Sequence, residues 1–123
     1  MKDTLGFLHA YGARVLLVYA IVLGLWGAYH YFRTHRLSGG FRSTFVIMAV
    51  LTPVQGLLGV AMLAAGGHPN EGILHMVYGA FATLFLPGAY VYSRGGDARR
   101  EALILAGASW IVAIAFFRGI ATG

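Results

Sequence analysis

The segment LGFLHAYGARVLLVYAIVLGLWGAYHYF, Leu5 to Phe32, decides the fold of this chain because it is long and almost entirely apolar. A helix needs about 20 apolar residues to cross about 30 Å of hydrocarbon at about 1.5 Å per residue. This segment exceeds that length, which predicts a helix that is tilted or that continues past the membrane surface. It shows no small-residue cleavage pattern before a polar mature region, so we expect no cleaved signal peptide.

Three more apolar segments follow, at about 41–65, 72–92 and 100–120, and each is long enough to span the hydrocarbon. Hydrophobic residues make up 59% of the chain and charged residues only 11%, whereas a soluble domain has roughly 25% charged residues. We therefore predict an all-α integral membrane protein. In this prediction residues 1–123 form a single membrane domain, an antiparallel bundle of four transmembrane helices.

The segments between the helices predict the orientation of the bundle. The first and third connections are rich in arginine, whereas the second, GGHPNEG, contains no Lys or Arg. The arginines are Arg33, Arg36, Arg42, Arg94, Arg99 and Arg100. Lys and Arg are enriched in cytoplasmic loops, so both basic connections should lie inside and both termini outside. Asn70 is the candidate N-cap of the third helix. We expect a multi-pass protein of the cell membrane, specifically a bacterial or archaeal plasma membrane.

The basic character of the chain does not require a nucleic acid partner. The formal net charge is +5, and the orientation of the helices together with attraction to anionic headgroups accounts for it. Membrane lipids are the expected partners, together with other membrane subunits or further copies of this chain. Cysteine is absent, which excludes disulfides, thiolate nucleophiles and Cys-ligated metal centres.

His9 and His75 occupy matching places in two stretches, LHAYGA at 8–13 and LHMVYGA at 74–80. In the predicted topology both lie roughly 5–6 Å below the outer ends of inward-running helices. The first and third helices of such a bundle are diagonal across its core, so the two rings would face each other. Two imidazoles in that position can supply both axial ligands of a haem. The alternative is two unrelated polar residues that bond neighbouring helices or reach the interface.

The other histidines are weaker candidates. His30 and His35 lie at the cytoplasmic end of the first helix, where lipid phosphate is the expected partner. The inner ends of the second and fourth helices carry no matching histidine pair, which argues against a second haem.

Several residues around the two histidines are candidates for cofactor binding. Gly12 and Gly79 allow close approach of a flat macrocycle, although ordinary helix packing is the preferred explanation of small residues. The propionates of a haem are anionic and would point outward from so shallow a site. Arg14, Arg118 and His68 are their candidate partners there. Snorkelling to the interface is the alternative for Arg14 and the preferred interpretation for Arg118.

Gln55 is a polar residue near the middle of the second apolar segment, shortly after Pro53. Proline lacks the backbone N–H, which predicts a kink at this point. The Gln55 amide needs a partner within hydrocarbon, either a carbonyl freed by the kink or a side chain across the bundle. We expect a structural role for it in preference to contact with a substrate or quinone.

With these features the chain resembles one lobe of the haem A synthase family, whose lobes are four-helix bundles with paired haem-ligating histidines. The resemblance rests on His9, on QGLLGVAML at 55–63, on LHM at 74–76 and on the interval between the two histidines. It implies a haem b held by His9 and His75. The catalytic lobe of that family has a Glu three residues before its first histidine and an Arg directly after it. Gly6 and Ala10 stand there in this chain, so the resemblance implies haem binding more strongly than haem oxidation.

Three functions remain open from the sequence. The first is a small b-type cytochrome, or a haem-bearing subunit of a respiratory or photosynthetic electron-transfer complex, with one bis-histidine haem near the outer face. The second is an enzyme like a single-lobe haem A synthase, and the third is a cofactor-free structural subunit of a larger membrane complex. No arrangement of carboxylates or of nucleophile and base indicates any other enzyme. Two axial ligands leave no coordination position open, which favours electron transfer over gas binding.

Overall fold

The computed structural model of the protein describes residues 2–66 and 72–122. Within these two ranges the chain is helical and contains no strand. The helices are α1 (Lys2–Tyr29), α2 (Gly39–Ala64), α3 (Gly72–Ser93) and α4 (Ala98–Thr122), and a short π-helix, η1 (His30–Thr34), continues α1. All four long helices are long and apolar enough to cross a membrane. The predicted all-α class with four candidate membrane helices is therefore confirmed.

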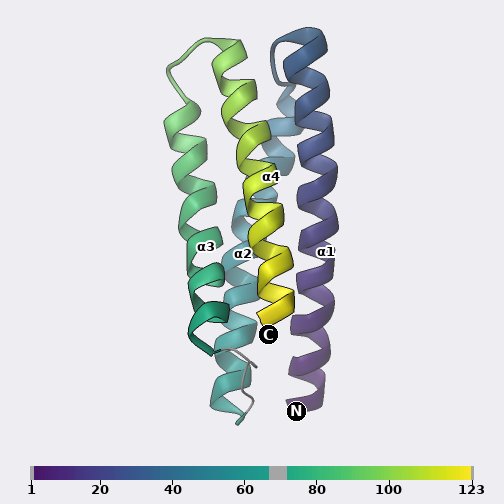
Figure 1. Ribbon diagram of the computed structural model, residues 1–123, viewed down its shortest axis with the longest axis vertical. Helices are drawn as coiled ribbons and strands as arrows, with labels where there is room; N and C mark the ends of the chain where they lie inside the picture. Colours follow the sequence, from purple (N-terminus) through teal and green to yellow (C-terminus); the bar gives the residue numbers. More distant parts are fainter. Residues whose placement is uncertain (1, 67–71, 123) are drawn as a thin grey trace.

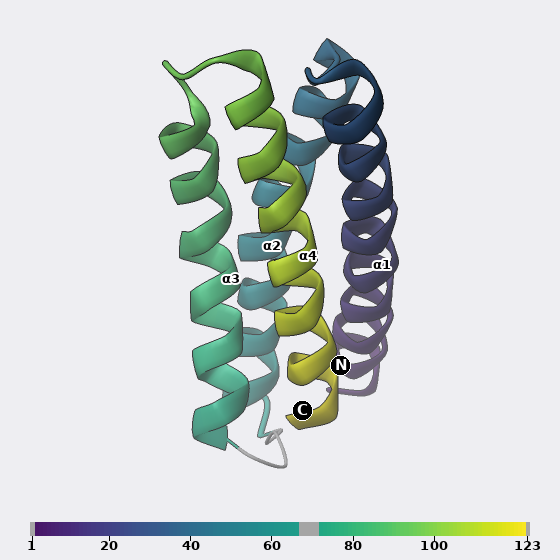
Figure 2. The same cartoon turned by 45° about the horizontal axis from the view of Figure 1, so that its top comes forward.

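The four helices lie side by side along one long axis (Figures 1 and 2). Helix α1 packs against α2 and α4, and α3 packs against the same two helices. The α1–α4 contact is the most extensive of these, and the α2–α3 contact is the least extensive. The two termini lie at one end of the bundle, while the α1–α2 and α3–α4 connections lie at the other (Figure 1).

The core of the bundle consists of large apolar side chains in its middle and at the end that holds the α1–α2 and α3–α4 connections, which we call the arginine-rich end. Leu23, Phe41, Phe45, Met48 and Leu86 are fully buried there, together with Leu105 and Val112. Fewer large side chains fill the other end, where the termini lie, and the cavity described below is found there. The outward-facing positions of the helices remain apolar, which is the composition that lipid contact requires.

The helix boundaries differ from the predicted ones by a few residues. Helix α2 begins at Gly39, two residues before the predicted segment, because the Ser38 hydroxyl accepts a hydrogen bond from the Phe41 N–H (3.1 Å) and caps the helix. The chain turns at His35, which adopts a left-handed conformation with φ of 61°. Helix α2 stays continuous through Pro53. The proposed cap Asn70 lies outside the described residues.

Two contacts join α4 to its neighbours at the arginine-rich end of the bundle. The guanidinium of Arg42 forms a two-pronged ion pair with Glu101, with Nε to Oε2 at 2.9 Å and Nη2 to Oε1 at 2.6 Å. The Arg99 guanidinium lies over the Tyr31 ring, 5.1 Å from its centroid. These contacts bind α4 to α2 and to η1, so the arginines of both basic connections gather at one end of the bundle.

The side chain of His30 faces the interior of the bundle, although its place in the sequence predicted contact with lipid. Its side chain is buried, with Trp26 and Phe41 rings at 5.7 and 6.0 Å between centroids. Its ring nitrogens lie 3.3 Å from the Thr34 hydroxyl and 3.4 Å from the Ser38 hydroxyl. The π-helical turn packs this ring inward, so His30 stabilises the end of α1. His35 is exposed and its Nδ1 lies 2.9 Å from the Tyr31 carbonyl oxygen.

Candidate functional site: a two-histidine cavity

The rings of His9 and His75 lie next to each other although they come from α1 and α3, which are diagonal in the bundle. Their centroids are 5.8 Å apart and their planes are inclined at 69°. The rings are therefore not stacked face to face. The structure thus brings together the two histidines that the sequence singles out, near the end of the bundle that holds the termini.

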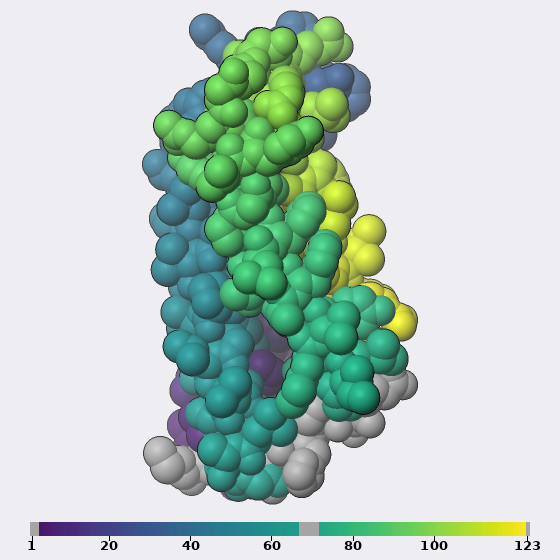
Figure 3. Space-filling model, turned by 90° about the vertical axis from the view of Figure 1, so that its left-hand side faces the viewer, coloured from purple at the N-terminus to yellow at the C-terminus, as the bar shows by residue number. Residues whose placement is uncertain are grey.

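The two rings border a cavity of about 310 Å³ to which all four helices contribute. Most of its wall is apolar or lacks a side chain, including Gly6, Ala10 and Ala13 from α1, Gly79 and Ala82 from α3, and Ala115 and Gly119 from α4. Figure 3 shows the face formed by α2 and α3, with a hollow between them through which purple atoms of α1 are visible. The limited α2–α3 packing thus leaves the cavity a lateral opening.

His75 is held in the tautomer that can bind a metal through Nε2. Its Nδ1 lies 2.9 Å from the carbonyl oxygen of Gly119. A carbonyl can only accept, so Nδ1 carries the proton and the neutral ring keeps a lone pair on Nε2. The Gly119 carbonyl is available because it belongs to the last turn of α4, where backbone acceptors lack helical partners. A backbone carbonyl on Nδ1 is the usual outer-shell support of a metal-binding histidine.

His9 has the opposite hydrogen-bonding pattern. Gln55 Nε2 lies 2.5 Å from the backbone oxygen of His9 and 3.0 Å from its Nδ1. The short contact to a carbonyl identifies this atom as the amide nitrogen, because an amide oxygen there would meet a second acceptor. The amide then donates its other proton to Nδ1, so the neutral His9 ring carries its own proton on Nε2. The partners of the Gln55 amide are thus the side chain and the backbone carbonyl of His9, across the bundle.

Two glycines, Gly12 and Gly59, leave the space that Gln55 and His9 occupy. A β-carbon on Gly12 would collide with the Gln55 amide oxygen, and a β-carbon on Gly59 would lie 3.0 Å from Cε1 of His9. Gln55 and Gly59 are one helical turn apart and share the α2 face that meets α1. This geometry gives a physical reason for the Gln-x-x-x-Gly spacing in the sequence. Gly12 therefore contacts Gln55, whereas Gly79 lines the cavity with open space beyond it.

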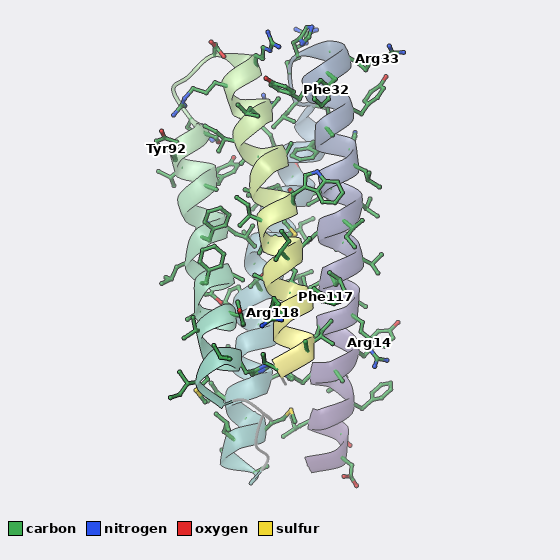
Figure 4. All side chains as sticks on the ribbon, in the orientation of Figure 1. Arg14, Phe32, Arg33, Tyr92, Phe117 and Arg118 are labelled. Atoms are coloured by element: carbon green, nitrogen blue, oxygen red, sulfur yellow. The ribbon has the colours of Figure 1, made fainter. Side chains whose placement is uncertain are left out.

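Arg14 and Arg118, two of the predicted partners of the haem propionates, are both exposed but point in different directions. Arg14 contributes to the cavity wall, but its side chain is exposed and extends from the outer side of α1, away from the other helices (Figure 4). Arg118 is also exposed; its Nε lies 3.4 Å from the hydroxyl of Tyr78, a residue of the cavity wall. The structure thus brings Arg118 to the rim and turns the Arg14 guanidinium outward. His68 lies outside the described residues.

Two residues of this site, Tyr78 and Gly119, were not predicted from the sequence. Tyr78 lies one turn after His75, and helical spacing could have placed it on the same face. Gly119 contributes only a backbone oxygen, which no residue type reveals. Within residues 2–66 and 72–122, no three His, Cys, Asp or Glu side chains form a group that could hold a metal ion. Any metal at this site would therefore depend on the two imidazoles.

The fold and the site define a bundle of four candidate membrane helices with a two-histidine cavity near one end. Comparison of the chain with protein-family models, curated proteins and solved structures gives no significant match.

Proposed function

We propose that this chain is a small b-type cytochrome of the cell membrane that holds one haem b between His9 and His75. The observation that carries the proposal is the approach of these two rings, with centroids 5.8 Å apart, at the edge of a cavity. Membrane histidines are uncommon, and two that meet across a bundle are better explained by a shared ligand than by two separate roles. The resemblance to a haem A synthase lobe supports the same cofactor.

The spacing of the rings fits a shared iron. Metal–imidazole bonds are about 2 Å long, so two imidazoles that share one metal must lie close to each other. The ring centroids of His9 and His75, 5.8 Å apart, meet that requirement. The cavity volume of about 310 Å³ is at the lower end for ligand pockets, and its lateral opening between α2 and α3 gives a flat group room to extend.

Each residue around the site has a role in this proposal. His75, with its lone pair on Nε2, and His9 would hold the iron, and the glycines and alanines of the wall would lie against the macrocycle. Arg118, at the rim beside Tyr78, is the better placed of the two arginines for a propionate. The haem, when bound, supplies reversible one-electron chemistry. The largely apolar wall of the cavity would limit the access of water to it.

We propose further that the helices are antiparallel in the membrane with both termini outside. The arginines gathered at the opposite end support this orientation, because such residues are retained on the cytoplasmic side. The haem then lies near the outer face, where a soluble or membrane-bound electron carrier reaches it. Other membrane subunits or copies of the chain, along with lipids, are the proposed partners.

Electron transfer is favoured over haem modification by the wall of the cavity. Within the described residues this wall contains no Asp or Glu. Gly6 and Ala10, which line it, occupy the positions of the catalytic Glu and Arg in the resembling family. A general acid or base for haem oxidation is therefore missing from those positions.

The test is the reduced-minus-oxidised absorption spectrum of the purified protein. We expect one haem b per chain, and we expect His9→Ala to lose the bis-histidine spectrum and His75→Ala to lose the haem. His35→Ala, at the opposite end of the bundle, is the matched control and should leave the spectrum unchanged. A folded protein without haem absorbance would contradict the proposal and favour a cofactor-free structural subunit.

A further inference from the structure

We propose that Gln55 sets the tautomer of His9, so that the two histidines are unequal ligands and the His9 side of the haem is open to exchange with a small diatomic ligand. The inference rests on the proposed haem but concerns the residues of the chain. It adds a class of ligand that a symmetric bis-histidine site would exclude.

The hydrogen bonds of the two rings differ in kind. His75 donates from Nδ1 to a backbone carbonyl and therefore offers a lone pair on Nε2. His9 accepts at Nδ1 from the Gln55 amide and therefore carries its proton on Nε2. Only a ring nitrogen with a lone pair can bind a metal. His75 is thus ready to ligate, whereas His9 must first transfer its proton to Nδ1 and break its bond to Gln55.

The surroundings hold Gln55 in this position. The amide oxygen lies against Gly12, where a larger residue would collide with it, and the amide nitrogen is anchored on the His9 carbonyl. The His9 ring in turn lies against Gly59. Within hydrocarbon a freed amide has no water to replace its lost hydrogen bonds, so breaking the Gln55–His9 contact is costly. Ligation by His9 competes with this cost, and ligation by His75 does not.

The opening of the cavity supplies the second requirement for exchange. A small ligand must reach the His9 side of the site, and the hollow between α2 and α3 gives a lateral path from the surface (Figure 3). Steric access and hydrogen-bond donors at the free position decide whether a haem takes up such a ligand.

The first arm of the test uses the haem-free protein labelled with ¹⁵N-histidine. Proton–nitrogen coupling patterns report which ring nitrogen carries the proton, and His9→Ala and His75→Ala assign the two signals among the five histidines. We expect the proton on Nε2 of His9 and on Nδ1 of His75. Gln55→Leu has no amide to donate to Nδ1, so the His9 proton should no longer be confined to Nε2. A wild-type His9 that carries its proton on Nδ1 would overturn the inference, whether or not haem binds.

The second arm uses carbon monoxide and the ferrous haem protein. We expect wild type to bind carbon monoxide, as His9→Ala should, and Gln55→Leu to bind it about tenfold more slowly, because His9 then becomes a ligand without breaking a hydrogen bond to residue 55. Leu57→Ala, on the exposed side of α2, is the control and should behave as wild type. If carbon monoxide binds His9→Ala but not wild type, His9 is a firmly held ligand and the inference is wrong. If no protein retains haem, the proposed function fails, while the tautomer measurement still decides the role of Gln55.

Discussion

Gly12 on α1 lies directly against the side chain of Gln55 on α2, so closely that a β-carbon at residue 12 would collide with the amide oxygen. This contact connects a residue without a side chain to Gln55, which carries the only side-chain amide within residues 2–66 and 72–122, and through it to His9. A glycine that looks like ordinary helix packing in the sequence is thereby part of the site.

Gly12→Ala should displace the Gln55 amide from His9. We expect the free energy of unfolding to fall by about 1–3 kcal/mol, the usual range for overpacking a filled contact. Reversible unfolding in mixed micelles measures it. Gly107→Ala on α4, where an added β-carbon meets no atom within 4 Å, is the control. It should stabilise by about 0.5–1 kcal/mol, because alanine favours a helix over glycine. Equal effects from both substitutions would show that Gly12 has no special contact.

The α1–α4 interface should depend on the absence of a side chain at Gly27. A β-carbon there would lie 2.7 Å from the β-carbon of Ala106. Gly27→Ala should therefore destabilise the bundle by about 1–3 kcal/mol. Adding Ala106→Gly removes the colliding atom. The double mutant should therefore be more stable than the sum of the two single changes predicts, by at least about 0.5 kcal/mol, a coupling expected of residues in direct contact. Strict additivity of the two changes, measured by the same unfolding equilibrium, would contradict this geometry.

The ion pair between Arg42 and Glu101 should stabilise the arginine-rich end only modestly. The two side chains are 39% and 15% exposed, so solvent screens part of their attraction. A double-mutant cycle of Arg42→Ala and Glu101→Ala should give a coupling free energy of about 0.5–1 kcal/mol, falling as salt is raised. Arg36→Ala, an exposed arginine of the same end, should change stability by less than about 0.5 kcal/mol. A coupling indistinguishable from zero at low salt would show that the pair adds nothing.

The proposed orientation can be measured with single cysteines, because the chain has none of its own. Thr4→Cys lies near the start of α1 and Gly39→Cys at the start of α2, and both positions are exposed. A membrane-impermeant maleimide added to intact cells should label the first and not the second, and detergent should make both reactive. Labelling of Gly39→Cys alone would reverse the orientation and place the histidines near the cytoplasmic face.

The position of the two histidines could be predicted in good part from the sequence. Helix order and matched depth are enough to expect His9 and His75 near each other, because both follow from segment length and a fixed rise per residue. The hydrogen bonds of the rings could not be predicted the same way. Two kinds of partner were possible for Gln55. Every residue has a backbone carbonyl oxygen, so nothing in the sequence marks that of Gly119 as the partner of His75. Arg14 and His30 show the same limit, since their directions depend on how each helix is rotated about its axis.

The sequence by itself determined that the chain forms four helices fit for a membrane, because the length and apolar character of a segment are enough for that conclusion. The tertiary structure decided which polar groups meet. Rotation of each helix is set by packing contacts such as Gly27 on Ala106 and Gly12 on Gln55, and these depend on shapes from distant parts of the chain. For this reason only the folded bundle distinguishes His75, paired with a carbonyl, from His9, paired with an amide.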